Sequence, residues 1–295
     1  MEFLTEFPSM GRRDLSALRQ AIDESFRSFS RAYGADLEAF FNPLLKFLVW
    51  FEDLLIEAPW PLVILVVAGL TWLGARSWKI TLGTILAFLV IGYFDMWEDT
   101  MATLAIISVA TIVCITLGIP IGILMARYDR AQSIITPVLD VMQTIPSFVY
   151  LIPVVMLLGI GKVPGLIAVC IYALPPIVRL TNLGIRLVDR EVMEAAEAFG
   201  ASYREKLFGV QIPLALPNIF AGVNQTIMMA LSMVVIASMI GVKGLGVPVL
   251  RAISNQYLAL GLMNGLAIVA LAIIFDRVSQ TYGKRLQSYR ESGHG

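Results

Sequence analysis

The chain has 295 residues, of which 58% are hydrophobic and 15% are charged, and its mean hydropathy is +0.78. This composition is typical of an integral membrane protein and excludes an ordinary soluble domain. The formal net charge is zero, so the bulk charge indicates neither a nucleic acid nor a strongly charged partner. Cys114 and Cys170 both fall in apolar stretches, where we expect packing and neither a disulfide nor a metal site.

The first 57 residues are polar and net acidic, with ten acids and six bases. Asn42 followed by Pro43 is typical of a helix start, and the next residues are apolar except for a narrow stripe of Lys46, Asp53 and Glu57. We predict an external polar tail that ends in an amphipathic helix on the outer, periplasmic-side interface. An eighth span, or a crossing helix packed on the bundle, is the alternative.

Seven stretches are apolar enough to cross a bilayer, which needs about 20 residues per helix. The predicted fold is therefore an all-α integral membrane protein with about seven transmembrane helices. Three of the stretches reach full length only if Trp60, Lys79 and Arg179 sit at the interfaces. The predicted spans are Ala58–Ala75, Trp78–Phe94, Thr100–Ala126, Val141–Gly161, Val163–Val178, Leu207–Val242 and Ala252–Phe275.

Lys and Arg concentrate in alternate connections, and basic loops favour the cytoplasm. This pattern predicts an external N-terminus, with Phe7 outside and Ser288 inside; Lys243 and Arg251 run against it. We divide the chain into the N-terminal tail (1–57), two N-terminal transmembrane helices (58–96), a core (97–279) that contains a cytoplasmic segment at 189–213, and a cytoplasmic tail (280–295).

The segment from 189 to 213 reads as two short helices around a bend. Asp189 can cap the first helix, and Gly200 can end it in the left-handed conformation. Ser202 and Glu205 have the spacing of a capping box for a second helix. Pro213 and the following Pro217 are predicted to stop that helix from running straight into the next span.

This segment resembles the EAA-x3-G-x9-I-x-L-P signature of permeases in ATP-binding-cassette (ABC) importers. Glu194, Ala195, Ala196, Gly200 and Pro213 match it, with Val210 and Ile212 in place of the usual Ile and Leu. The resemblance implies that the segment docks on a separate ATPase subunit and couples ATP hydrolysis to transport. It assigns the coupling role to Glu194, Ala195, Ala196, Gly200, Ser202, Glu205 and Pro213.

Longer runs resemble the permeases of glycine betaine and proline betaine (choline-type osmolyte) importers. They include MQTIPSFVYLIPVVMLLGIGKVPG (142–165), ALPPIVRLTNLGI (173–185) and AGVNQTIMMALSMVVIASMIGVKGLG (221–246). The resemblance implies a type-I importer permease fold in the bacterial inner (cytoplasmic) membrane and a homodimer that carries two ATPase subunits, which hold ATP and Mg. It also implies a periplasmic binding protein, expected as a separate chain, and a quaternary-ammonium cargo such as glycine betaine, proline betaine or choline.

Two stretches are more polar or more flexible than lipid-facing helices require. One contains a proline break with amide and hydroxyl groups, and the other combines amides with methionines. Both suit a translocation path, and packing through small or polar residues is the alternative. The candidate path residues are Gln143, Thr144, Pro146, Phe148, Tyr150, Asn224, Met228, Met229 and Met233.

Other functions are less consistent with the sequence. The chain has no GxxxxGK[ST] motif, so we expect no cofactor in it and no ATP hydrolysis by it alone. Asp140, Arg179 and Asp276 lie near predicted cytoplasmic ends, so we interpret them as groups that reach the interface and expect no charge at membrane depth. That expectation favours a small zwitterion or soft cation as cargo. A permease for another amino acid or zwitterion, a stand-alone secondary transporter and an intramembrane enzyme are the alternatives.

Overall fold

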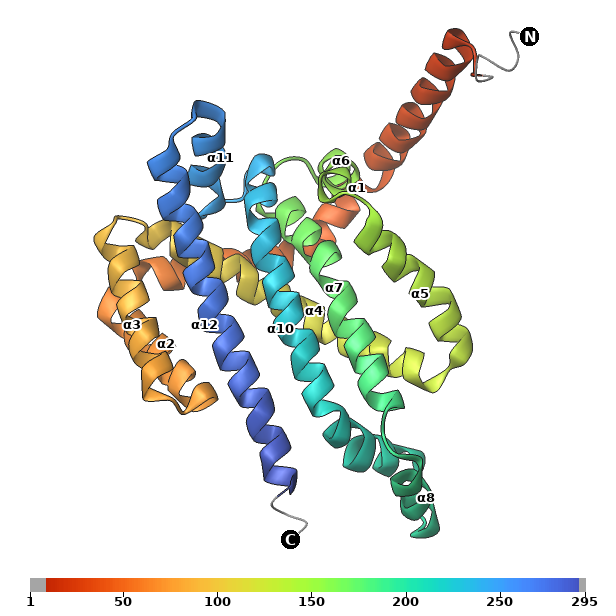
Figure 1. The fold of residues 1–295 in the computed structure, drawn as a ribbon. Coiled ribbons are helices and arrows are strands. Elements are labelled where there is room, and N and C mark those ends of the chain that lie inside the picture. The colour runs from red at the N-terminus through yellow and green to blue at the C-terminus, as the bar shows by residue number, and fades with distance from the viewer. Residues whose placement is uncertain (1–8, 292–295) are drawn as a thin grey trace, which may run out of the picture.

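The computed structural model describes residues 9–291, and over that range the chain is helical with short connections (Figure 1). The all-α prediction is therefore confirmed. In chain order the helices are α1 (Arg12–Glu57), α2 (Trp60–Ala75), α3 (Trp78–Tyr93), α4 (Trp97–Arg127), α5 (Asp129–Thr144), α6 (Ser147–Leu158), α7 (Lys162–Arg186), α8 (Arg190–Ala198), α9 (Tyr203–Glu205), η2 (Lys206–Gln211), α10 (Ile212–Ala237), η3 (Ser238–Ile240), α11 (Gly246–Asn255) and α12 (Leu258–Glu291).

The N-terminal region differs from the predicted tail and helix start. α1 is one helix of 46 residues that continues through Pro43, so the prediction that a helix begins at Asn42 is wrong. Leu48 and Glu52 are buried where α1 crosses the bundle, and Glu52 pairs with Lys162 at 2.7 Å. α1 then turns by 112° into α2. The structure therefore has the alternative arrangement, in which this helix crosses the bundle and packs on it.

The predicted fourth span is not one straight helix. The chain from 141 to 161 does not form one helix, because it breaks at Ile145 and Pro146, where α5 and α6 meet at 101°. α5 instead begins at Asp129, within a stretch interpreted as a cytoplasmic loop. In Figure 1 α5 runs along the same side of the bundle as α7, and α6 lies at the opposite end of α5 from its junction with α4.

The core of the bundle is formed by α4, α7 and α10, with α12 packed on α10. Small residues let these helices approach closely: a Cβ at Gly184 on α7 would lie 2.8 Å from the Cβ of Asn218 on α10. At Gly122 on α4 a Cβ would lie 2.6 Å from the Cβ of Thr181 on α7. α2 and α3 pack against α12 on the other side of the bundle (Figure 1).

Four helical stretches in the described residues are long and apolar enough to cross a membrane, or up to six when each bent pair is one span. The shorter apolar α3 would be the seventh. The predicted span 252–275 is interrupted, because α11 ends before Gln256, a left-handed residue, and α12 starts at Leu258. α12 continues to Glu291, so the predicted cytoplasmic tail from 280 begins within a helix. Phe7 lies outside the described residues, and so does the side chain of Ser288.

Candidate functional site

The segment at 189–213 begins with α8, which stands free at the end of the bundle where α7 terminates (Figure 1). The Asp189 carboxylate accepts a hydrogen bond from the backbone N–H of Glu191 at 2.9 Å, which confirms the predicted N-cap. Arg190 and Glu194 pair along the helix at 2.9 Å. None of the nine residues of α8, all of them described, is buried. Most of the surface of the helix is therefore accessible, with Met193 and Ala196 half-buried.

The bend after α8 has the predicted geometry. Gly200 has a φ of 78°, in the left-handed region that glycine adopts without strain. The Glu205 carboxylate accepts a hydrogen bond from the backbone N–H of Ser202 at 2.7 Å, and the Ser202 hydroxyl accepts one from the N–H of Glu205 at 3.4 Å. This is the complete predicted capping box, and its hydrogen bond to Ser202 lowers the pKa of Glu205.

Sequence reasoning missed the apolar part of this surface. Phe199, next to the left-handed glycine, is 92% exposed, and Leu187 and Phe208 are each 65% exposed. Ala195 is exposed and Ala196 is half-buried, so α8 adds small side chains to the same end of the molecule. The sequence signal for this exposed surface was an apolar residue at a bend expected to face solvent. The pattern of the segment provides no apolar face against which Phe199 could pack.

Side-chain contacts join this segment to the bundle. The Arg127 guanidinium, at the end of α4, lies 4.1 Å from the ring centroid of Tyr203 and 4.9 Å from that of Tyr128. Lys206 pairs with Glu197 across the bend, and this contact lowers the pKa of the Glu197 carboxyl. The segment thus contacts α4 through Tyr203, and α8 contacts η2 through Glu197.

The expectation that prolines separate this segment from the next span is wrong. Residues 203–240 form one continuous helical stretch of 38 residues. Pro213 stands in the first turn of α10, and the six residues before it, η2, are π-helical. The wider turn of η2 accommodates Pro213, which has no N–H to donate, without ending the helix. The part of the segment from Tyr203 onward is therefore in direct helical continuity with α10.

The first candidate path stretch lies on an uncovered surface at the α5–α6 break. Gln143, Thr144, Pro146 and Phe148 are exposed, whereas Tyr150 is buried at 8%. Ser133, Thr136, Asp140 and Gln143 recur at three- and four-residue intervals and so follow one side of α5. We call these four residues the polar stripe of α5. Sequence reasoning missed it because an amphipathic helix has no long apolar run.

The second candidate stretch lies mostly inside the bundle. Met233 is fully buried in the main core, and Met228 and Met229 are half-buried against that core. Met233 packs in the core in this conformation, as the packing alternative has it, and its path assignment stays a prediction. Asn224 donates a hydrogen bond to Asp276 on α12 at 2.9 Å, which places it between helices. The two stretches are therefore in different environments.

The expectation that the chain has no charge at membrane depth stays a prediction, but the charged groups it concerns have partners within the protein. Arg179 on α7 forms an ion pair with Asp140 of the polar stripe. A second pair joins the same two helices at the N-terminal end of α5 and the C-terminal end of α7, where Arg186 binds Asp129 at 2.7 Å. Asp276 accepts hydrogen bonds from Asn224 and Gln280. These groups have protein partners in place of interfacial water.

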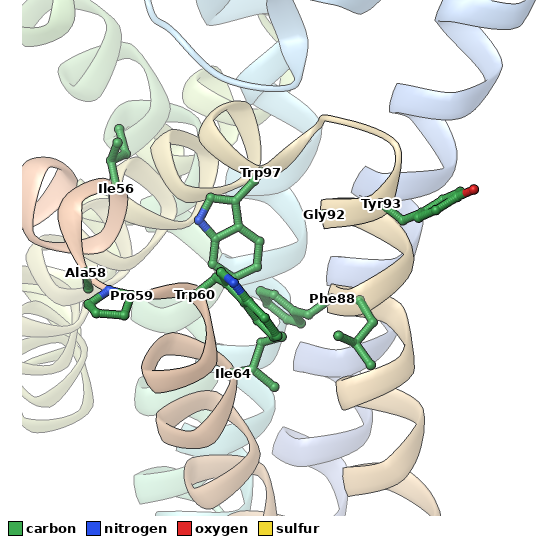
Figure 2. Close-up of a pocket in the computed structure, with 10 residues that line it drawn as sticks. Ile56, Ala58, Pro59, Trp60, Ile64, Phe88, Gly92, Tyr93 and Trp97 are labelled. Carbon is green, nitrogen blue, oxygen red and sulfur yellow. The ribbon is translucent and has the colours of Figure 1, made fainter.

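A cavity of about 600 Å³ lies where α1, α2, α3 and α4 meet (Figure 2). Trp60, Phe88 and Trp97 line it, and the rings of Phe88 and Trp97 meet edge to face at 6.2 Å between centroids. Figure 2 shows the two indoles facing one another near the start of α2. The cavity contains no candidate coupling or path residue, and its aromatic lining is typical of a membrane interface.

Together, a multi-helix membrane bundle and a free, capped helix at one end define the membrane-spanning subunit of a multi-component transporter. The chain belongs to the family of binding-protein-dependent transport system inner membrane components, whose model matches residues 118–288. It is thus a multi-pass inner-membrane permease subunit. The osmolyte-permease resemblance and the type-I importer fold are confirmed by this match and by the similarities that follow.

Among curated relatives, the chain is 50% identical over 238 residues to the glycine betaine/proline betaine transport system permease protein ProW of Escherichia coli (strain K12), covering 81% of this chain and 67% of that protein. It is 44% identical to the glycine betaine/carnitine transport permease protein GbuB of Listeria monocytogenes, covering 85% and 92%. A chain of the MetNI methionine ABC transporter in an inward-facing conformation has a TM-score of 0.58 at 17% identity, covering 65% and 95%, and supports the fold alone.

Proposed function

We propose that this permease carries a small quaternary-ammonium zwitterion such as glycine betaine, driven by ATP hydrolysis on two separate ATPase subunits. ATP and Mg would bind those subunits and not this chain, and a periplasmic binding protein would deliver the cargo. The observation that carries the proposal is α8: a capped helix with no buried residue, joined by the bend at Gly200 to a helical stretch that runs from α9 through η2 into α10. Such a helix contributes no residue to the core of its own chain.

The coupling role falls on the residues that shape this helix and its bend. Glu194 pairs with Arg190, while Ala195 and Ala196 keep one side of α8 small enough for close approach. Gly200 reverses the backbone, and Ser202 and Glu205 fix the start of α9. We add Phe199 to this set, because an exposed phenyl ring between two capped helices is suited to an apolar socket on the ATPase.

The polar stripe of α5 supports a homodimer. Exposed Asp140 and Gln143 cannot face lipid, because hydrocarbon offers no partner for a charge or an amide. Within the described residues nothing covers this side of α5, which also carries exposed Pro137 and Val141. A second copy facing the same surface would enclose the stripe around a water-filled path. The break at Pro146 would then lie at the outer mouth of that path.

The cargo class is supported by the relatives and by the charges on the path. The names of two relatives that the chain matches at 50% and 44% identity include glycine betaine. The charged group of the stripe, Asp140, forms a balanced pair with Arg179 on α7, which suits a molecule carrying one charge of each sign. The second candidate cargo is another small zwitterion or amino acid, because the same ion pair would suit it as well.

The test is uptake by liposomes that contain this permease, its ATPase and the binding protein encoded beside it. We expect ATP-dependent accumulation of radiolabelled glycine betaine, and ATP hydrolysis that rises when the loaded binding protein is added. Uptake without the ATPase would instead identify a secondary transporter. Accumulation of other amino acids with glycine betaine excluded would favour the second candidate.

A further inference from the structure

The geometry points to a binding site within the permease itself, in which the cargo inserts between Asp140 and Arg179. Its cationic group would lie against the carboxylate of Asp140, and its carboxylate against the guanidinium of Arg179. This inference deepens the proposed function and rests on it, because the site takes a zwitterion and not simply an ion.

Arg179 belongs to α7, one of the helices long and apolar enough to cross a membrane. Arg179 precedes Arg186 by seven residues on α7, and a helix rises 1.5 Å per residue, so the two guanidinium-bearing positions are about 10 Å apart along the axis. The neighbouring residues Leu139 and Val178 are buried against Met125 in a small core between α4, α5 and α7. Asp140 and Arg179 therefore lie on the open side of the α5–α7 junction, 55% and 37% exposed.

Arg179 has unused hydrogen-bonding capacity. A guanidinium carries five N–H donors, and the bond to Asp140 uses Nη2. The Nε of Arg179 is buried and has no hydrogen-bond partner in the described part of the chain. A planar donor group with free N–H positions is the side chain best matched to a carboxylate, which it can bind through two parallel hydrogen bonds.

The Asp140 carboxylate suits a quaternary ammonium group. Such a group has no N–H and is held by negative charge and by aromatic faces. Tyr172 lies two turns before Arg179 on the same side of α7, the helix that carries the guanidinium partner of Asp140. The Tyr172 ring is therefore the candidate aromatic face on this side of α7.

The second ion pair between α5 and α7 shows what a structural pair looks like in this molecule. Arg186 donates to the Met125 carbonyl at 2.9 Å, to Asn182 at 3.1 Å and to Asp129 at 2.7 Å, so its donors are used by three different groups. Arg179 has one partner. Because a part-exposed pair is stabilised only weakly, Asp140 and Arg179 can separate to admit a molecule that replaces each charge.

The test measures equilibrium binding of radiolabelled glycine betaine and choline to the permease–ATPase complex in nanodiscs, without binding protein. Choline carries the same cationic group but no carboxylate. For Arg179→Gln we expect affinity for glycine betaine to fall roughly tenfold, the loss typical of a charged hydrogen bond, with affinity for choline retained or increased. For Asp140→Asn both affinities should fall. Arg186→Gln, the matched control on the same helix, should leave the ratio of the two affinities unchanged.

A merely structural pair would change both ligands equally, so an unchanged ratio in Arg179→Gln overturns the site. Absence of glycine betaine binding to the wild-type complex also overturns it. If that same complex, given its binding protein, still accumulates glycine betaine, the proposed function stands and only the internal site fails. If it accumulates none, the proposed function fails as well.

Discussion

The two ends of the bundle are held together by different kinds of contact. At the coupling end, the bonds of Asp189, Arg190 and Ser202 all join residues at most four positions apart. At the other end, where α1 crosses α6 and α7, the Ser30 hydroxyl donates to the carbonyl of Met156, 126 residues away, and Glu52 pairs with Lys162. The caps and the bend at the coupling end are thus determined locally, although Tyr203 also contacts Arg127 of α4, whereas the α1 crossing depends on tertiary packing.

This difference predicts that changes at the coupling end affect transport without affecting the bundle. Ala196→Trp would place a large ring on α8, and Gly200→Val would force a β-branched residue to a φ of 78°, at a strain of about 1–2 kcal/mol. We expect ATP-driven uptake to be lost in both variants while membrane insertion and thermal stability are kept. Uptake and binding-protein-stimulated ATP hydrolysis in liposomes measure the effect.

Gly209→Val is the matched control, because Gly209 lies in the same exposed segment without a positive φ and has open space around its Cα. We expect it to retain most of the uptake. Wild-type uptake in both Ala196→Trp and Gly200→Val would show that this segment does not couple the two subunits. Loss of the folded bundle in Gly200→Val would mean that the two ends are not independent.

At the α1 crossing the expected effect is on stability. Lys162→Ala leaves Glu52, whose side chain is 8% exposed, without its partner, which we expect to cost about 1–3 kcal/mol. The thermal unfolding temperature of the detergent-solubilised permease should fall. Replacing both partners together, Glu52→Leu with Lys162→Met, should recover much of that loss, because an apolar pair leaves no buried charge. Equal stability of Lys162→Ala and wild type would show that α1 is not fixed by this contact.

The same contrast explains which features could be predicted from the sequence. The N-cap at Asp189, the left-handed Gly200 and the capping box each depend on residues a few positions apart. The spacing of those residues in the sequence was therefore sufficient to predict them. The spans α4, α7 and α10 were predictable because long apolar runs are themselves the signal. α1 was misjudged because Pro43 was interpreted as a helix start, whereas packing of Leu48 and Glu52 on the bundle supports a helix that continues through it.

The path was the least predictable part. α5 carries polar residues along one side and apolar ones along the other, so hydropathy over a window averages the two and hides the helix. The pairing of Asp140 with Arg179 depends on the turn between α5 and α6 and on how α5 packs against α7, neither of which leaves a local pattern. The residue type alone does not distinguish Met228 and Met229 from core residues, because methionine is common in cores, and both side chains are half-buried in the structure.

The smallest expected effect tests how much the local caps contribute. Ser202→Ala removes the hydroxyl that accepts from Glu205, a change that typically costs a helix about 1 kcal/mol, whereas Ser202→Thr keeps an acceptor. We expect a few-fold weaker stimulation of ATP hydrolysis in the alanine variant and nearly normal stimulation in the threonine variant.

The pKa of Glu205 is lowered from 4.5, chiefly by its hydrogen bond to Ser202, and that of Glu197 is lowered from 4.5 by Lys206. A carboxyl with a depressed pKa contributes fully above its unfolded-state value, and the contribution is lost only as the pH falls through the folded-state pKa, below 4.5. The deficit of Ser202→Ala should therefore be the same at mildly acidic and at neutral pH. A deficit that changes between those two conditions would mean that a group other than these carboxylates controls the bend.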